Sequence, residues 1–246
     1  MKILMPVAGR GRRTQGRAAG LPKCLVLAAQ RELLLWALES IHHQPEDLVV
    51  VYHESQRDAV VPALARLRPQ ATLVEQQHDL RGAADTVYCA APHIAAADQV
   101  AIIDCDFFAD SAFQWPGWSR RPIDGSILTV RSDDPAKSFV TEAAGWITEI
   151  REKEPISSDA VAGIYHFSYP RDLLWALETQ FAAGLRTNGE FFVSGAMQFY
   201  LTRRPRVEMV RATRFVDLGE TEKIGRFEAV VRADGAQRER TDKELT

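Results

Sequence analysis

The chain has few cysteines and no long apolar run. Its 246 residues include 3 cysteines, too few and too scattered for a disulfide framework or a paired-cysteine metal site. No apolar stretch approaches the length of a membrane span or a signal-peptide core. We therefore expect a soluble protein that stays in a reducing cytoplasm. Internal repeats and low-complexity segments are also missing, which argues against a solenoid or a disordered linker.

The chain also carries no large excess of positive or negative charge. The net charge of -3 gives no general attraction to nucleic acid or to an anionic membrane, so we expect neither as a partner. The 6 histidines are dispersed, and no Gly-x-Ser-x-Gly segment is present, which argues against a hydrolase triad. With 46% hydrophobic residues the chain suits one globular domain. We assign that domain to residues 1–231 and treat residues 232–246 as a charged terminal tail.

The chain opens with an apolar run followed by a basic, glycine-rich loop. Residues 2–7 predict a buried strand, and Gly9 and Gly11 allow a ligand to approach the backbone closely. Five cations lie between Arg10 and Lys23. Such a loop suits a polyphosphate, although on charge alone a solvated surface is the simpler interpretation.

Two familiar phosphate-binding motifs do not fit this loop. The dinucleotide fingerprint fails because Thr14 stands where its third glycine belongs. A Walker loop has the spacing of Gly11 and Gly16, but Arg17-Ala18 replaces the lysine and hydroxyl residue that hold phosphate and magnesium. The loop therefore needs another explanation.

Apolar periodicity predicts that strands and helices alternate through the first half of the chain. This order favours a mostly parallel sheet with helices on both faces and ligands at the carboxyl ends of its strands. The second half predicts more strand than helix, hence a mixed sheet, with a crossing loop around Phe113–Trp118. Expected strands are residues 2–7, 48–52, 71–74, 100–103, 126–131, 139–141, 146–150, 163–167, 207–210 and 214–216. Expected helices are residues 31–43, 56–67, 82–91, 171–182 and 189–201.

Two carboxylates follow the buried run at residues 100–103 directly. Asp104 and Asp106 would stand at the open edge of the parallel sheet, where carboxylate oxygens suit a magnesium ion that also binds phosphate. Aspartates also cap helices and start turns, so the pair alone is weak evidence. Its position after a buried strand favours the functional interpretation.

The loop resembles the signature of nucleotidyltransferases that act on sugar 1-phosphates and related phosphorylated compounds. That signature runs approximately A-G-x-G-[ST]-R, a variable loop, then P-K-x-L. Arg12 departs from it, since it stands in the usual Ser/Thr place. The matching residues are Ala8, Gly9, Gly11, Arg13, Pro22, Lys23 and Leu25.

Further segments resemble this family in the expected order. Asp217-Leu-Gly resembles its D-[IL]-G-T-P-E segment, although Glu220-Thr221 departs from the usual Thr-Pro. Glu152-Lys153, followed by Gly163-Ile-Tyr-His-Phe167, resembles its E-K and G-[IVL]-Y-x-F pattern. The remaining likenesses are Glu75-Gln76, Gly82 at a helix start, and Asn188-Gly189-Glu190. Helix caps, turns and solvated charge runs are the structural alternatives for these segments.

The resemblance implies a Rossmann-like three-layer α/β/α sandwich with a mixed, mostly parallel sheet, of the nucleotide-diphosphosugar transferase type. It also implies transfer of a nucleotidyl group from a nucleoside triphosphate to a phosphorylated acceptor, with release of pyrophosphate. The implied catalytic residues are Arg13, Lys23 and Lys153, and Asp106 and Asp217 are the implied Mg²⁺ ligands. The implied nucleotide-binding residues are Ala8, Gly9, Gly11, Arg13, Lys23, Gln76 or its neighbour Glu75, Gly82 and Asp104. The implied acceptor-binding residues are Glu152, Lys153, Gly163 and Glu190.

Several alternatives stay open at this point. CTP and UTP are the favoured donors, ahead of dTTP and GTP, and the acceptor is a hexose or heptose 1-phosphate or another small compound such as phosphocholine, used in surface polysaccharide decoration. The length leaves no room for the left-handed β-helix of some relatives, and a homo-oligomer is compatible with the sequence. A glycosyltransferase of related architecture is one rival, though it grips no triphosphate. A nucleotide-sensing domain without turnover is the other.

Overall fold

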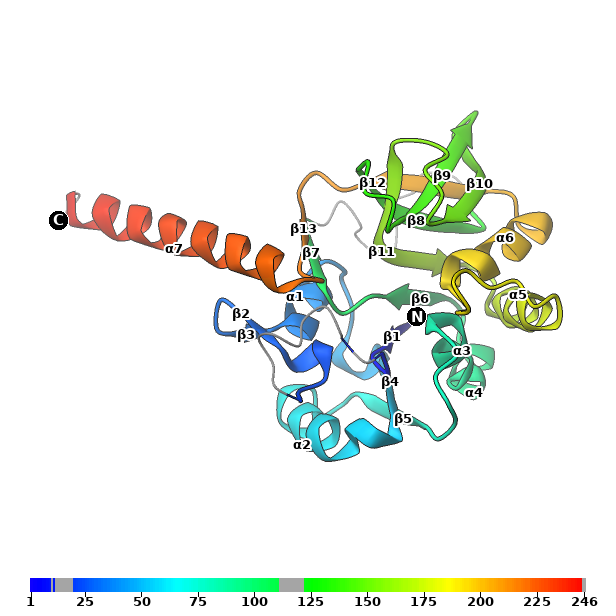
Figure 1. Ribbon diagram of the computed structural model, residues 1–246, viewed down its shortest axis with the longest axis horizontal. Coiled ribbons are helices and arrows are strands. Elements are labelled where there is room, and N and C mark those ends of the chain that lie inside the picture. Colours follow the sequence, from blue (N-terminus) through cyan, green and yellow to red (C-terminus); the bar gives the residue numbers. More distant parts are fainter. Residues whose placement is uncertain (10, 12–19, 111–121, 245–246) are drawn as a thin grey trace.

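A nine-stranded mixed sheet forms the centre of the molecule in the computed structural model (Figure 1). The structure describes residues 1–9, 11, 20–110 and 122–244, with side chains as far as residue 233. The main path of the sheet runs β10-β9-β11-β6-β1-β4-β5, and β8 joins β11 to β12. The strands are β1 Lys2–Pro6, β4 Leu48–His53, β5 Thr72–Gln76, β6 Val100–Ile103, β8 Gly125–Arg131, β9 Ser138–Ala143, β10 Trp146–Glu152, β11 Asp159–Phe167 and β12 Val207–Arg211.

The parallel half of the sheet is apolar on both faces. Along β1, Leu4 packs into one hydrophobic cluster, whereas Ile3 and Met5 pack into the other, because successive side chains of a strand point to opposite faces. The strands β1, β4, β5 and β6 are parallel, and β11 runs antiparallel to β6. These observations confirm the predicted mixed, mostly parallel α/β fold.

Helices cover the two faces and complete three layers. The helices α1 Leu33–Glu39 and α2 Arg57–Leu67 contribute to one cluster. The opposite face is covered by helices that contribute to the other cluster: α3 Ala83–Tyr88, α4 Ala91–Ala95, α5 Pro170–Ala182 and α6 Val193–Arg203.

Two small strand pairs lie outside the main sheet. In one, β7 Phe107–Ala109 pairs antiparallel with β13 Phe215–Asp217. In the other, β2 Leu27–Ala28 pairs with β3 Arg31–Glu32. Short turns η2 Lys23–Leu25, η3 Pro45–Asp47 and η4 Glu54–Gln56 complete the elements.

Several predicted helix boundaries were wrong for local reasons. The helix expected over residues 31–43 begins at Leu33, because Arg31–Glu32 forms the second strand of a hairpin. The helix expected over residues 82–91 is two helices, since Pro92 lacks the amide that a continuous helix requires. The helix expected from Gly189 starts at Val193, after an Asn-Gly turn with φ of 51° and 83°.

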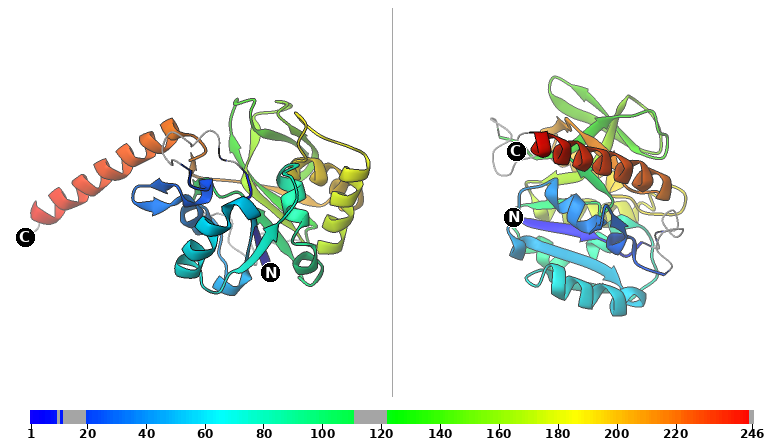
Figure 2. Two further views of the ribbon diagram at one scale, coloured as in Figure 1. Left: turned by 60° about the horizontal axis from the view of Figure 1, so that its bottom comes forward. Right: turned by 90° about the vertical axis from the view of Figure 1, so that its left-hand side faces the viewer.

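The C-terminal part of the chain is helical. Helix α7 Thr221–Glu244 packs its first turns through Ile224 and Phe227 against the region of β2 and Trp36. Figures 1 and 2 show its later turns extending away from the rest of the molecule. Residues 232–244, expected as a terminal tail, thus continue this helix, in keeping with their content of alanine, glutamate, arginine and lysine. The crossing loop expected around Phe113–Trp118 lies outside the described residues.

No described helix combines the length and the apolar character that crossing a membrane requires.

The buried histidine of β11 makes the free energy of unfolding depend on pH. His166 is 0% exposed, with Nε2 3.1 Å from Gln99 Oε1, and burial lowers its pKa from 6.5 to about 3. Between these values the unfolded chain binds a proton that the folded chain does not. The contribution of His166 to the free energy of unfolding therefore falls as pH falls from 6.5 toward 3.

We expect His166→Gln to flatten the pH dependence of stability, because this variant has no such proton to bind on unfolding. Between pH 6 and pH 4, the slope of the unfolding free energy should decrease by up to about 1.4 kcal/mol per pH unit. Urea denaturation of both proteins at several pH values measures the slope. The same substitution at the exposed His42 is the matched control and should leave the slope unchanged. Equal slopes in wild type and His166→Gln would refute the assignment.

Candidate active site

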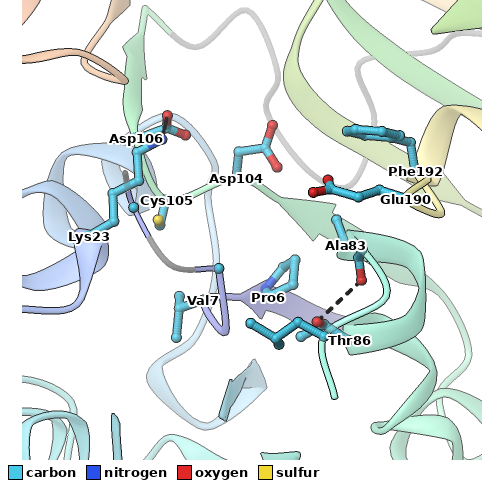
Figure 3. Close-up of a pocket in the computed structure, with 14 residues that line it drawn as sticks. Pro6, Val7, Lys23, Ala83, Thr86, Asp104, Cys105, Asp106, Glu190 and Phe192 are labelled. Atoms are coloured by element: carbon cyan, nitrogen blue, oxygen red, sulfur yellow. Dashed lines mark hydrogen bonds and ion pairs between the residues drawn. The ribbon is translucent and has the colours of Figure 1, made fainter. Parts of the chain in front are cut away.

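Two adjoining cavities open where β1 and β6 end. The larger, of about 570 Å³, is lined by residues that follow β1, by the start of α3 and by residues that follow β6 (Figure 3). The smaller, of about 290 Å³, extends toward β9, β10 and β13. The residues that line both are Lys23, Ala83, Asp104, Asp106 and Phe192. The cavities thus meet at a lysine and two aspartates.

The glycine-rich loop borders the larger cavity. Gly9 and Gly11 line it, and Gly11 has a φ of 56°. Gln56 Nε2 donates to the carbonyls of Val7 and Gly9, both at 3.3 Å, and thereby holds the start of the loop. Ala8 is buried beneath it. Arg12 and Arg13 lie outside the described residues.

Lys23 and the residues after β6 form the centre of the site. The Lys23 ammonium makes an ion pair with Asp106, and Figure 3 shows the two side chains side by side. Asp104 points into the same space, as does Glu190 from the connection between α5 and α6. Desolvation by the surrounding protein and the nearby charge of Asp106 raise the pKa of Asp104 to about 7, although its side chain is exposed to the cavity.

Asp217 reaches the same place from the far end of the chain. The pairing of β7 with β13 sets Asp217 opposite Phe107, and the amide of Leu218 donates to the carbonyl of Asp106 at 2.8 Å. A Cβ on Gly219 would stand 2.8 Å from Asp106 Oδ2 and 3.0 Å from Asp217 Oδ1. Only glycine leaves this space open.

A Cβ on Gly219 would also stand 3.6 Å from Lys23 Nζ, so two carboxylate oxygens and an ammonium border this space. Carboxylate oxygens suit magnesium, which takes one or two of them together with phosphate oxygens and water. The described residues contain no group of three or more histidine, cysteine or acidic side chains with the geometry of a metal site. Any metal bound here would therefore need ligand oxygens from a substrate or from water.

Two further lysines, which sequence reasoning missed, hold Asp217. Lys137 donates to its Oδ2 at 3.1 Å and Lys223 at 2.9 Å, while Oδ1 accepts the amide of Gly219 at 2.9 Å. Burial by itself would raise the pKa of Asp217, but these lysines and this amide lower it to about 2. Asp217 is thus held as a carboxylate. Lysines in polar turns or at helix starts carry no distinctive pattern, so only their place in the fold identifies them.

Of the predicted acceptor residues, Glu152 and Gly163 line the smaller cavity, whereas Glu190 lines the larger one. Glu152 accepts hydrogen bonds from the hydroxyls of Ser138 and Ser194, the latter at 2.7 Å. Gly163 has a φ of 85°, and a Cβ there would stand 2.8 Å from the ring of Phe107. Lys153 has its ammonium 4.4 Å from the ring centroid of Phe192 and lines neither cavity.

Gln76 lies behind the larger cavity and is 1% exposed. Its amide oxygen accepts the hydroxyl of Thr86 at 2.8 Å, and its amide nitrogen donates to Asp85 at 3.2 Å. Thr86 lines the larger cavity, so Gln76 supports a wall of it. Glu75 pairs with Arg57, with both hydrogen bonds at 2.6 Å, and lines neither cavity.

The fold places a glycine-rich loop, a lysine and paired carboxylates at the strand ends, as the resemblance to nucleotidyltransferases implies. The chain belongs to the family of MobA-like NTP transferase domains, whose model matches residues 4–137. This confirms the family resemblance predicted from the sequence motifs. No curated protein sequence matches the chain.

Solved structures share the fold over nearly the whole chain. A nucleoside-diphosphate-sugar pyrophosphorylase from Vibrio cholerae RC9 has a TM-score of 0.76 at 20% identity, covering 92% of this chain and 99% of that one. An inositol-1-phosphate CTP transferase from T. maritima has a TM-score of 0.71 at 16% identity, covering 90% of each chain. A CTP:phosphocholine cytidylyltransferase from Streptococcus pneumoniae has a TM-score of 0.67 at 15% identity, covering 94% and 98%.

Gly82 occupies a position where no other residue fits. It starts α3 with a φ of 123°, and a Cβ there would stand 2.3 Å from the carbonyl oxygen of Phe191. The close approach is fixed by two backbone hydrogen bonds, Phe191 N to Arg81 O at 2.7 Å and Ala84 N to Phe191 O at 3.0 Å. Gly82 therefore joins α3 to the segment that carries Glu190 and Phe192.

We expect Gly82→Ala to lower the free energy of unfolding by about 2–4 kcal/mol, since it adds a backbone clash to a strained φ. Gly184→Ala is the matched control, because Gly184 also has a positive φ, of 61°, but has open space around it. The control should lose only about 1 kcal/mol. Urea denaturation measures both losses. Equal losses would show that the contact with Phe191 is unimportant.

Proposed function

We propose that this protein transfers a nucleotidyl group from a nucleoside triphosphate, with CTP or UTP favoured, to a sugar 1-phosphate or another small phosphorylated acceptor. Pyrophosphate is the second product. The observation that carries the proposal is the meeting of the two cavities at Lys23, Asp104 and Asp106. A volume of about 570 Å³ suits a nucleotide, and the adjoining 290 Å³ suits a smaller acceptor.

The chemistry requires alignment and charge stabilisation, with no protein nucleophile. An oxygen of the acceptor phosphate attacks the α-phosphorus, a new P–O bond forms, and the bond to the β-phosphate breaks as pyrophosphate leaves. Lys23, at the junction of the cavities, is assigned to the α-phosphate. Arg13 in the glycine-rich loop is assigned to the β- and γ-phosphates. Positive charges in these roles would stabilise the negative charge that develops on the transferred and leaving phosphates.

Asp106 and Asp217 are the proposed ligands of a magnesium ion. The open space beside Gly219 and the low pKa of Asp217 support this assignment. When bound, the ion would neutralise part of the phosphate charge. Lys23, which pairs with Asp106 in the described structure, would then be available to the phosphates.

The acidic lining of the smaller cavity favours an acceptor with hydroxyl or amine donors beside its phosphate. Glu152 is fixed by two serine hydroxyls and lines the cavity, so it can accept a hydrogen bond from such a group. Inositol 1-phosphate, the sugar 1-phosphates and phosphocholine, suggested by solved structures with this fold, form the first panel to test.

Pyrophosphate release tests the proposal directly. Each of CTP, UTP, dTTP and GTP is combined with each acceptor of the panel, with and without magnesium. We expect a signal that requires one triphosphate, one acceptor and the metal together. A nucleoside triphosphate that binds but releases no pyrophosphate with any acceptor would contradict nucleotidyl transfer and favour a sensing role.

We expect Asp106→Asn and Arg13→Ala each to reduce turnover by about two to three orders of magnitude, because each removes a fixed charge at the reacting phosphates. Both proteins should remain folded by circular dichroism and keep a cooperative urea transition. Asp98→Asn, at an exposed aspartate away from both cavities, is the control and should keep full activity. Turnover near that of the wild type in either variant would remove that residue from the active site.

A further inference from the structure

We propose that Lys137 is the side chain that receives the phosphate of the acceptor, an assignment that rests on the proposed nucleotidyl transfer. The family motif assigns this role to Lys153. The positions of the two ammonium groups in this fold assign it to Lys137.

Lys137 lies in a hydrogen-bonded turn between β8 and β9. The turn is closed by the amide of Lys137, which donates to the carbonyl of Asp134 at 3.1 Å, and by the amide of Ala136, which donates to Asp134 Oδ1 at 3.0 Å. From this turn the side chain reaches into the smaller cavity, where it packs over the ring of Phe215, 5.2 Å from its centroid, and meets Asp217. Its position is therefore set by contacts on several sides.

The charge of the smaller cavity requires a cation for any phosphate that enters. Among its described lining residues, the acidic ones outnumber the basic ones: Asp104, Asp106, Asp134, Glu152 and Asp217 against Lys23 and Lys137. A phosphate dianion would be repelled by such a lining without direct contact to a positive group. Lys23 lines both cavities and pairs with Asp106, whereas Lys137 lines the smaller cavity alone.

Lys137 retains donor capacity for a ligand. An ammonium has three N–H donors, and among the described residues Lys137 makes one hydrogen bond, to Asp217 Oδ2 at 3.1 Å. Lys223, the other lysine on that oxygen, is shared with Glu220 at 3.0 Å and lies 3.8 Å from Asp134. Lys223 can therefore keep Asp217 paired while Lys137 turns to a phosphate.

The side chain of Lys153 lies in a different place from that of Lys137. Its backbone amide donates to the carbonyl of Lys137 at 3.0 Å, yet its side chain leaves in another direction and stacks on Phe192. Phe192 lines both cavities. Lys153 thus supports a ring between donor and acceptor instead of entering the acceptor cavity.

Steady-state kinetics with the acceptor and triphosphate found by the pyrophosphate assay compares Lys137→Gln, Lys137→Arg and Lys153→Gln. We expect Lys137→Gln to raise the acceptor KM about 10- to 100-fold, the range for loss of a charged hydrogen bond, and to leave the triphosphate KM within a factor of about two. Lys137→Arg should recover part of the loss, and Lys153→Gln should raise the acceptor KM less than Lys137→Gln does. An unchanged acceptor KM in Lys137→Gln, or an equal rise in both KM values, would overturn the assignment.

A second measurement tests Lys137 even if the wild-type protein releases no pyrophosphate. The protein is acetylated with limiting reagent at increasing inorganic phosphate, and the modification of each lysine is quantified by peptide mass spectrometry. Phosphate should protect Lys137 more than Lys153, while Lys2, whose ammonium bonds the carbonyl of Glu46 away from both cavities, provides the unprotected reference. Protection of Lys153 alone, or of neither lysine, would overturn the assignment. If no pyrophosphate is released but phosphate protects Lys137, nucleotidyl transfer is rejected and the phosphate site at Lys137 is retained.

Discussion

The pairing of β7 with β13 is the constraint on which the site depends. It joins the segment after β6 to a segment near the end of the chain, and the amide of Leu218 completes it by donating to the carbonyl of Asp106. These backbone hydrogen bonds fix the distance between Asp106 and Asp217 independently of any bound ion. The backbone that carries the two carboxylates is consequently held by the fold itself.

Bringing acidic side chains together has an electrostatic cost, which the fold offsets with lysines from three separate places. Lys23 comes from the turn after the glycine-rich loop, Lys137 from the turn before β9, and Lys223 from the first turn of α7. Each pairs with Asp106 or Asp217. These ammonium groups are the ones to which the proposals above assign the phosphates.

Close backbone approach shapes the two cavities. Gly163 lets Phe107 pack against β11, Gly219 leaves open the space between the carboxylates, and Gly82 accepts the backbone of Phe191. Phe191 in turn precedes Phe192, whose ring borders both cavities. The division between the larger and the smaller cavity therefore depends on positions where a methyl group would not fit.

The C-terminal segments connect the site to helix α7. Asp217 leads through Gly219 into α7, whose Lys223 bonds the same carboxylate and whose Phe227 packs against Trp36 with ring centroids 5.1 Å apart. The first turns of α7 thus hold Asp217 in place. The later turns extend away from the body of the protein (Figures 1 and 2).

The sequence by itself determined where the central strands lie along the chain, because strands buried on both faces require continuous apolar runs. It also predicted Lys23 and Asp106 as site residues from a motif and a strand end, and the fold places both where the two cavities meet. Helix starts such as that of α1 were missed because the hairpin of β2 and β3 overrides helical spacing. Only the tertiary structure brought Lys137 to Asp217 and set Lys153 aside on Phe192, because the direction of a side chain depends on contacts between segments that are distant in the sequence.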